Sequence, residues 1–388
     1  MTYDHGLALL SLRRRWLTTA GLGVAALVAG AALLLPALDR DAVIRWLLVA
    51  AGVLGYQLAF VGRRLSLNHP EGEDGLLPGF GPGNTLTLLR GVLLALLAGF
   101  LVVPWPRGPL AWAPAVLYMA ADVADYFDGY LARVSRHATL LGQAIDMEFD
   151  ALGLLVGVGV AIHLGQLPTG FLPFGLARYA FVLGVGILER CGRTTHPLPE
   201  SVSRRPIAGL TMAFVSAALW PVVIPPAATL AGILFAIPFA ASFGRDGLVV
   251  SGILDPDSDV YRIGRRRLKR LLLNLLPPVL RALLAVALAL LTARMLQSPP
   301  VWAPAPQALF VGLQVLAGVC IAAGFVGRLA AVGLIVPLGL GAHAEGLSPL
   351  RGWAFGLAIA ILILGTGAAS LWKPEETRLR RRAGERDD

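Results

Sequence analysis

Four aspartates occur at helical spacing in an otherwise apolar chain, within the segment DYFDGYLARVSRHATLLGQAIDMEFD from Asp125 to Asp150. Residues three, four, seven and eight positions apart share one face of a helix, and one such face holds Asp125, Asp128, Gly129, Ala132 and Arg133. A second face holds Gly142, Asp146 and Asp150. If the basic link from Val134 to Ala138 turns the chain back, the two faces meet and four carboxylates converge.

Convergent carboxylates predict a cation site. In apolar surroundings these charges repel one another, and each is costly to desolvate unless a cation pairs with it. Hard divalent ions that prefer oxygen ligands, Mg²⁺ or Mn²⁺, are the natural partners. The small residues Gly129, Ala132 and Gly142 let a ligand or the facing backbone approach closely. The expected metal ligands are Asp125, Asp128, Asp146 and Asp150.

The composition indicates an integral membrane protein. Of the 388 residues, 56% are hydrophobic and 15% are charged, and the mean hydropathy is +0.70, which excludes an ordinary soluble enzyme. A membrane span takes about 20 apolar residues, and Pro-rich and Gly-rich gaps separate the apolar runs. We therefore predict an all-α polytopic helix bundle of twelve spans, centred on Leu27, Ala51, Ala95, Tyr118, Gly157, Leu183, Ala218, Leu234, Ala285, Val315, Gly333 and Ala360.

The formal net charge of +9 is explained by arginines that orient the chain in a membrane, so we expect no nucleic-acid partner. The arginine-rich segments fall on one side of the twelve-span arrangement, from residues 13–15 near the start to residues 380–382. Because positive residues mark the cytoplasmic side, we expect both termini and the aspartates to be cytoplasmic, in a bacterial cytoplasmic membrane. The two cysteines, Cys191 and Cys320, lie far apart and predict neither a disulfide framework nor a zinc site.

The apolar runs group into blocks separated by polar and basic segments. The first long gap is rich in Gly and Pro, and the second is rich in Arg, which favours the inner leaflet of a membrane. In chain order we predict a two-span N-terminal extension (1–64), a linker (65–83), a six-span catalytic core (84–244), a basic interfacial linker (245–270), a four-span C-terminal domain (271–373) and a charged tail (374–388).

The aspartate segment also carries a known signature. Its pattern, D-x2-D-G-x2-A-R-x8-G-x3-D-x3-D, resembles that of the CDP-alcohol phosphotransferase family without a spacing defect. The preceding PGNTLTLLRG, residues 82–91, is similar to the first core helix of that family, with an Asn and a Thr in the same arrangement. The resemblance covers roughly residues 80 to 245 and says nothing about the flanks.

The resemblance implies an enzyme that transfers a phospho-alcohol from a CDP-alcohol to an acceptor hydroxyl and releases CMP. Two divalent ions held by the four aspartates would screen the pyrophosphate and organise an in-line displacement. Asp150 resembles the family's general base for the acceptor hydroxyl. By the same resemblance, the residues expected to line the nucleotide and its diphosphate are Asn84, Thr87, Gly129, Ala132, Arg133 and Gly142.

The leading hypothesis is phosphatidyl transfer from CDP-diacylglycerol to a polyol or polyol phosphate, in phospholipid biosynthesis. Within the family, a soluble CDP-alcohol with a diacylglycerol-type acceptor is the alternative, and the resemblance also implies a homodimer. A membrane carrier is a third hypothesis, because intramembrane carboxylates also line ion paths. A membrane scaffold is the fourth, because GFVGRLAAVGLIVPLG and GTGAASLWKPE show a likeness to DoxX-like four-helix membrane domains.

We also make predictions for charged residues that lie outside the signature. Arg90 lies about two turns into its span, where it either braces the aspartates or contacts substrate. Asp122 extends the first acidic face by one turn, whereas Glu148 lies off the second face and is expected to be solvated. Four arginines border one predicted cytoplasmic loop: Arg190, Arg193, Arg204 and Arg205. Membrane topology explains basic residues there, and contact with an acceptor phosphate is the alternative.

Overall fold

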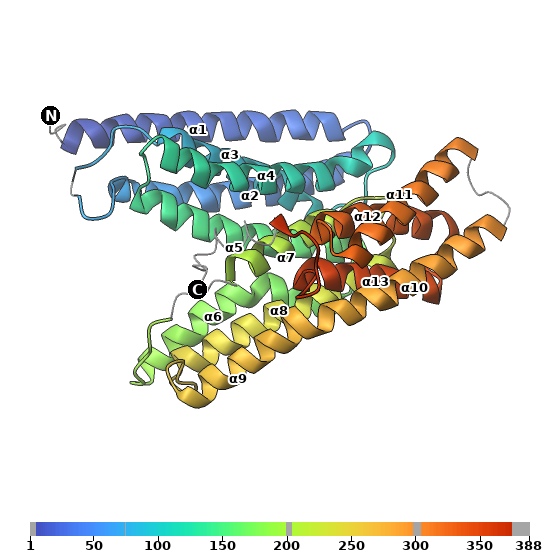
Figure 1. The fold of residues 1–388 in the computed structure, drawn as a ribbon. Helices are drawn as coiled ribbons and strands as arrows, with labels where there is room; N and C mark the ends of the chain where they lie inside the picture. The colour runs from blue at the N-terminus through green and yellow to red at the C-terminus, as the bar shows by residue number, and fades with distance from the viewer. Residues whose placement is uncertain (1–4, 74, 199–203, 298–303, 375–388) are drawn as a thin grey trace. The chain divides into compact units, whose positions relative to one another are not determined.

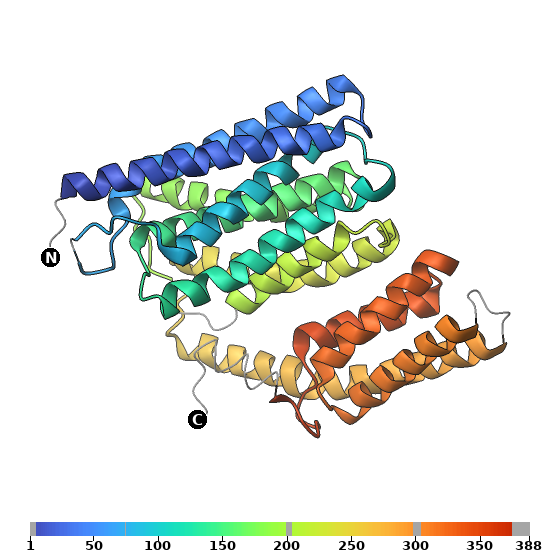
Figure 2. The same cartoon turned by 90° about the horizontal axis from the view of Figure 1, so that it is seen from above.

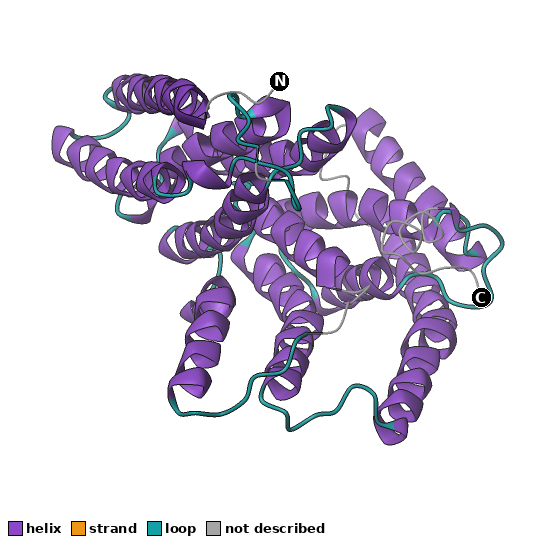
Figure 3. Ribbon diagram, turned by 90° about the vertical axis from the view of Figure 1, so that its left-hand side faces the viewer, coloured by secondary structure: helices purple, strands orange, loops and turns teal. Residues whose placement is uncertain are grey.

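The structure is a computed structural model that describes residues 5–73, 75–198, 204–297 and 304–374. The regular secondary structure in these ranges is helical, apart from one isolated bridge between Phe325 and Trp372 (Figure 3). The predicted all-α class is therefore confirmed for the described residues. The chain divides into two compact units.

The first unit comprises Met1–Tyr179 and Val215–Pro221. Its helices up to the start of α6 are α1 (His5–Leu34), α2 (Arg40–Gly62), η1 (Leu65–Leu67), α3 (Gly81–Ala98), η2 (Gly99–Leu101), η3 (Gly108–Trp112), α4 (Ala113–Val134), α5 (Leu140–His163) and η4 (Thr169–Phe171). Helix α3 contacts α1, α2, α4 and α5, and the five run alongside one another as a bundle (Figures 1 and 2). The predicted N-terminal extension thus packs in the same unit as the first helices of the predicted core.

The second unit comprises Ala180–Phe214 and Val222–Asp388. Its boundary falls inside α6 (Leu172–Arg190) and α7 (Arg204–Ala218), each of which contributes to both units. The remaining helices of this unit are α8 (Pro225–Val250), α9 (Asp259–Arg270), the π-helical η5 (Leu271–Leu275), α10 (Leu276–Gln297), α11 (Pro304–Ala323), α12 (Gly327–Glu345) and α13 (Pro349–Leu364). Of the predicted charged tail, residues 375–388 lie outside the described residues.

Each of the twelve predicted span centres lies in a separate helix, namely α1 to α8 and α10 to α13. Within the described residues, seven helices are long and apolar enough to cross a membrane. Helices α4 and α5 fall outside this group although they are long, since they carry the aspartates, and α7, α11 and α13 have shorter apolar stretches. These features support an integral membrane protein.

Two glycines let α3 pack closely against α4 and α5. A Cβ atom at Gly83 would lie 2.8 Å from both the Cβ of Ala132 and the carbonyl oxygen of Asp128. A Cβ atom at Gly91 would lie 2.6 Å from the ring of Phe149 on α5. Only residues without a side chain permit these approaches. The buried polar residues of α3 between the two glycines, Asn84, Thr87 and Arg90, are therefore held against the acidic helices.

Within the predicted linker, residues 65–83, a buried asparagine holds the described part of the segment against the chain. Asn68 is fully buried, and its amide donates hydrogen bonds to the carbonyl oxygens of Leu77 (2.9 Å) and Gly79 (2.8 Å). The backbone amide of Leu140, at the start of α5, donates to the carbonyl of His69 at 3.0 Å. Gly and Pro mark turns in a sequence but do not show whether a polar side chain holds those turns together. Asn68 does so here.

A buried arginine joins two helices of the second unit and the segment that follows α13. Arg281 on α10 donates to the carbonyl oxygens of Ile321 (2.8 Å) and Ala322, in the last turn of α11. It also donates to the carbonyls of Thr366 (3.1 Å) and Ala369 (2.6 Å), in the segment after α13. The last carbonyls of a helix lack partners within the helix. Arg281 supplies donors for two of them and ties the C-terminal segment to the same point.

The predicted basic interfacial linker, residues 245–270, contains the end of α8, a turn and the whole of α9. Ser258 caps the start of α9, because its hydroxyl accepts a hydrogen bond from the amide of Tyr261 at 3.4 Å, and none of the residues of α9 is buried. Helices α9, η5 and α10 form one uninterrupted helix of 39 residues, Asp259–Gln297 (Figure 1). The basic segment is thus continuous with a predicted span.

Candidate active site

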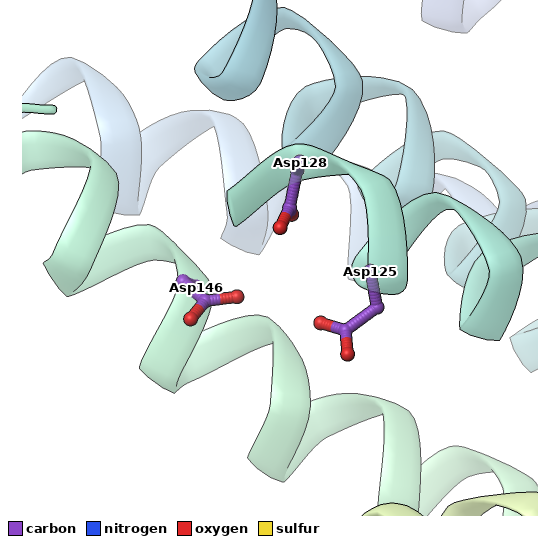
Figure 4. A group of neighbouring side chains, drawn as sticks. All are labelled: Asp125, Asp128 and Asp146. Atoms are coloured by element: carbon purple, nitrogen blue, oxygen red, sulfur yellow. The ribbon is translucent and has the colours of Figure 1, made fainter. Parts of the chain in front are cut away.

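Two acidic helix faces confront each other in the first unit. Asp125 and Asp128 project from α4, and Asp146 projects from α5 toward them (Figure 4). One carboxylate oxygen from each of these three residues, the aspartate trio, lies within 4.8 Å of the other two. Asp150, one turn further along α5, is linked to the same cluster through Arg90. The predicted convergence of the two faces is observed for the trio, while Asp150 lies beside it.

The turn between the helices follows from local sequence. Helix α4 ends at Val134, and Arg136 takes a left-handed backbone conformation with φ of 52°. Thr139 then caps α5, because its hydroxyl accepts a hydrogen bond from the amide of Gly142 at 3.0 Å. Threonine is a favourable residue at such a position. The reversal lies where the basic link from Val134 to Ala138 predicts it.

Arg90 of α3 lies among the four aspartates. Its guanidinium is 3.7 Å from Asp128, 3.3 Å from Asp146 and 3.0 Å from Asp150, and it also contacts Asp125. The side chain is 1% exposed, and Nη2 also donates to the backbone carbonyl of Asp146 at 3.1 Å. Of the two alternatives left by the sequence, Arg90 braces the aspartates in this structure.

The charges in the cluster remain unbalanced. One guanidinium faces four carboxylates, of which Asp128 is buried while Asp146 and Asp150 are half exposed. Arg90 engages one oxygen of each carboxylate, so each retains a second oxygen. A group of carboxylate oxygens with this spacing and an excess of negative charge suits a hard divalent cation. The trio therefore fits the predicted Mg²⁺ or Mn²⁺ site.

The two polar residues of α3 that were predicted to contact the diphosphate point toward protein groups. The hydroxyl of Thr87 donates to Asp128 at 2.8 Å. The amide of Asn84 donates to the hydroxyl of Thr139 at 3.0 Å and to the side-chain oxygen of Asn68 at 3.3 Å. Both residues are buried. In this structure they orient the acidic helices, and their role toward a nucleotide stays a prediction.

Asn68 belongs to this network but was not predicted from the sequence. It holds the folded linker and accepts a hydrogen bond from Asn84, so it connects the linker to the site. The signal available was a single polar residue in a Gly-rich and Pro-rich segment. That signal does not distinguish a buried side chain from a solvated one.

The three small residues of the signature have different surroundings. Apart from its chain neighbours and its own helix backbone, the one described atom within 4 Å of a Cβ built at Gly129 is Nη1 of Arg133, at 3.3 Å, so Gly129 borders open space. Ala132 packs against Gly83, and a Cβ at Gly142 would lie 2.3 Å from the side-chain oxygen of Asn84. Space for a ligand is thus present at Gly129, beside the exposed Arg133, whereas the other two sites accommodate protein.

Two acidic residues outside the signature also have protein partners. Asp122 is hydrogen-bonded to Ser216. Glu148, on the opposite side of α5 from Asp146, accepts hydrogen bonds from the hydroxyls of Tyr56 (2.6 Å) and Tyr179 (3.1 Å). Glu148 was expected to be solvated; it is partly exposed, but it also has two protein partners. Both tyrosines come from other helices, so no local pattern predicts them.

The predicted alternative for the loop arginines remains untested. In the second unit, Arg204 donates to both carboxylate oxygens of Asp246, at 2.7 Å and 3.3 Å. Arg190 and Arg193 are exposed. The side chain of Arg205 lies outside the described residues.

Comparison with known proteins identifies the segment that holds the site. Residues 82–243 match the sequence profile of the family described as CDP-alcohol phosphatidyltransferase. The chain is also similar to a CDP-diacylglycerol–glycerol-3-phosphate 3-phosphatidyltransferase of Cereibacter sphaeroides, with 31% identity over 110 residues. That match covers 28% of this chain and 49% of the relative, so the chain spans about half the length of the curated relative it matches. No solved structure matches the chain significantly.

The profile match includes α3, α4 and α5, and therefore every residue of the acidic cluster and its bracing arginine. Helices α1, α2 and α9 to α13 lie outside it. Residues 82–243 of this chain, which hold the candidate active site, are thus similar to a CDP-alcohol phosphatidyltransferase domain.

Proposed function

We propose that the protein transfers a phosphatidyl group from CDP-diacylglycerol to the hydroxyl of a polyol or polyol phosphate and releases CMP. The observation that carries this proposal is the convergence of the aspartate trio across two facing helices, inside the segment that matches the family. The donor is proposed from the name of the Cereibacter sphaeroides relative, which specifies CDP-diacylglycerol and glycerol 3-phosphate. Glycerol 3-phosphate is therefore the first acceptor to test.

The aspartates of both helices would hold the metal. We assign Asp125, Asp128 and Asp146 as ligands, with Asp150 as a further ligand at the edge, and we propose two Mg²⁺ or Mn²⁺ ions. When bound, these ions supply positive charge that screens the diphosphate and stabilises the leaving oxygen of CMP. Thr87 keeps one oxygen of Asp128 oriented by its hydrogen bond of 2.8 Å. Arg90 holds the carboxylates together against their mutual repulsion.

Asp150 is the proposed general base. Its side chain is 43% exposed and is anchored to Arg90 at one oxygen, so the carboxylate borders both the cluster and open space. In the proposed step the acceptor oxygen bonds to the phosphorus of the phosphatidyl group while the phosphorus–oxygen bond to CMP breaks. Asp150 takes the proton of the acceptor hydroxyl. Gly129 leaves room beside α4 for the nucleotide, and Arg133 would pair with phosphate charge.

We propose that the site opens toward the cytoplasm. The aspartates lie near the end of α4 and the start of α5, and the turn between these helices carries Arg136, with Arg133 just before it. Clustered arginines favour the cytoplasmic side. A CDP-linked lipid could then enter from the inner leaflet with its diphosphate at the depth of the aspartates.

The test uses purified full-length protein reconstituted with CDP-diacylglycerol and Mg²⁺. Glycerol 3-phosphate, glycerol and inositol are supplied one at a time, while CMP release and the mass of the lipid product are followed. A parallel reaction with a soluble CDP-alcohol and diacylglycerol tests the alternative within the family. We expect product only with CDP-diacylglycerol. If neither donor is consumed, the carrier and scaffold hypotheses replace this proposal.

The metal assignment is tested with Asp128→Asn and a matched control. Asp128→Asn keeps the shape of the side chain but removes its charge, so we expect CMP release to be abolished. Asp259→Asn makes the same change at a side chain that is 88% exposed on α9 and should leave CMP release unchanged. A chelator should abolish turnover in the wild type. Undiminished turnover in Asp128→Asn, or in the chelated protein, would refute the metal assignment.

A further inference from the structure

The back of α5 carries a carboxylate that the proposed chemistry does not use. Successive residues of an α-helix are rotated by about 100°, so Glu148 projects about 160° away from both Asp146 and Asp150. It faces α2 and α6, and its side chain is half-buried. The same helix thus presents two carboxylates to the metal cluster and a third in the opposite direction.

Two tyrosines hold this third carboxylate. Tyr56 of α2 and Tyr179 of α6 both donate to Oε1 of Glu148, at 2.6 Å and 3.1 Å. A length of 2.6 Å is typical of a hydroxyl donating to an ionised carboxylate. Both tyrosines belong to helices long and apolar enough to cross a membrane, where a carboxylate without partners is costly. The tyrosines supply neutral donors, so they stabilise the charge without removing it.

We propose that Glu148 is a positioning residue, and that the Tyr56–Glu148–Tyr179 cluster, the tyrosine clamp, fixes the rotation of α5 about its own axis. The clamp keeps Asp146 and Asp150 turned toward α4. This inference rests on the proposed function for its activity readout. It also assigns a role to α2, which lies outside the family match: α2 supplies one of the two groups that hold the metal-binding helix in place.

The geometry indicates how much a loosened clamp matters. Side-chain atoms lie about 5–6 Å from the axis of a helix, so a rotation of roughly 10° moves a carboxylate by about 1 Å. Metal–ligand distances tolerate deviations of about 0.2 Å. A displacement of about 1 Å in a reacting group can lower a rate roughly a hundredfold. We therefore expect a tenfold to hundredfold fall in kcat, with a smaller change in KM for CDP-diacylglycerol.

The test compares variants that delete the clamp with one that preserves its geometry. Glu148→Ala removes the acceptor, and Tyr56→Phe removes only the donor of the shorter bond. Glu148→Gln keeps an oxygen that accepts from both hydroxyls and should restore most of kcat. Tyr261→Phe makes the same change as Tyr56→Phe on α9, in the second unit, and should keep wild-type kcat.

A second readout does not depend on turnover. The affinity of the donor-free protein for Mn²⁺ is measured by electron paramagnetic resonance, after size-exclusion chromatography and thermal unfolding confirm that each variant is folded. We expect Glu148→Ala and Tyr56→Phe to bind Mn²⁺ at least about tenfold more weakly than the wild type, and Glu148→Gln to bind it nearly as well. If Glu148→Ala does not fold, Tyr56→Phe and Tyr179→Phe, each of which deletes one hydroxyl, decide the matter.

Three outcomes overturn the clamp: wild-type kcat and Mn²⁺ affinity in Tyr56→Phe and Glu148→Ala, an equal loss in Tyr261→Phe, or no recovery in Glu148→Gln. The last would mean that the charge of Glu148, rather than its hydrogen bonds, acts on the site. Failure of the proposed function is distinguishable, because a wild-type protein that consumes no CDP donor still permits the Mn²⁺ comparison. In that case weaker Mn²⁺ binding by Tyr56→Phe supports the clamp, and unchanged binding overturns it.

Discussion

Replacing Arg90 with methionine removes a guanidinium but keeps an unbranched side chain of similar length. Arg90 is 1% exposed and contacts all four aspartates, so the variant leaves these carboxylates without their shared countercharge. In the absence of a divalent cation the carboxylates then repel one another across the α4–α5 interface. We expect the first unit to unfold at a lower temperature in a chelator, while its fold in Mg²⁺ is largely retained.

The burial of each partner sets the magnitude. Only Asp128 is nearly as buried as Arg90, with 8% of its side chain exposed. Removing one partner of a buried ion pair costs about 3–5 kcal/mol, while the contacts to the more exposed aspartates are screened and each contributes about 0–1 kcal/mol. Because the freed carboxylates can turn toward solvent, we expect Arg90→Met to lower the free energy of unfolding by about 3 kcal/mol, the low end of this range. For a unit of this size that corresponds to a fall in Tm of roughly 6–12 °C.

Mg²⁺ should reverse part of this loss. A ligand present at a hundredfold excess over its Kd stabilises the folded state by about 2.7 kcal/mol. In the wild type, Arg90 competes with the metal for the same carboxylates, whereas in Arg90→Met it does not. The rise in Tm between chelator and saturating Mg²⁺ should therefore be larger in Arg90→Met than in the wild type.

The assay is thermal unfolding of purified protein in detergent, in chelator and across a Mg²⁺ titration, with Arg262→Met as the matched control. Arg262 pairs with Asp259 on α9 at 3.5 Å, with both side chains more than half exposed, so its loss should change Tm little. Two results would contradict this expectation: unfolding of Arg90→Met in chelator at the wild-type temperature, or an equal rise in Tm with Mg²⁺ in both proteins.

Substitutions at three further positions test the packing around the site and in the second unit. Gly83→Val should lower Tm by several degrees and reduce CMP release, because its side chain would collide with Ala132; Gly83→Ala should give a smaller loss in the same two measurements. Asn68→Ala should cost about 1–3 kcal/mol by removing the partner of the half-buried Leu77 carbonyl and freeing Asn84, measured as a lower denaturant midpoint and faster proteolysis of residues 65–83. Arg281→Met should lower the stability of the second unit by a similar amount while leaving Mn²⁺ affinity unchanged, and a loss of Mn²⁺ binding would contradict this.

The local periodicity of the sequence predicted the helices and the two acidic faces. Asp125 and Asp128 share a face because they are three residues apart, and Asp146 and Asp150 because they are four apart, and these relations hold in any helix. The turn between the helices was also predictable, because a chain reversal between the two faces had to fall in the short basic link from Val134 to Ala138. What made the convergence predictable was that both faces belong to consecutive helices.

Contacts between distant residues were not predictable in the same way. Glu148 and Tyr56 are 92 residues apart, and nothing in the periodicity of either helix indicates that they meet. Gly142 was expected to make room for a ligand or a facing backbone, but the side chain of Asn84 lies there. A glycine indicates that another group packs closely against the helix, but only the structure shows whether that group is a ligand, a backbone or a side chain. The central place of Arg90 was left open for the same reason.

The uninterrupted helix of α9, η5 and α10 has a consequence for how the C-terminal part of the chain sits in a bilayer. Its 39 residues extend for about 58 Å, roughly twice the thickness of the hydrocarbon layer. Six of the first twelve residues are Arg or Lys, which are unfavourable in the hydrocarbon layer of a membrane. In a bilayer, the apolar part of this helix would tilt to match the hydrocarbon layer, while its basic turns would stay at the membrane surface.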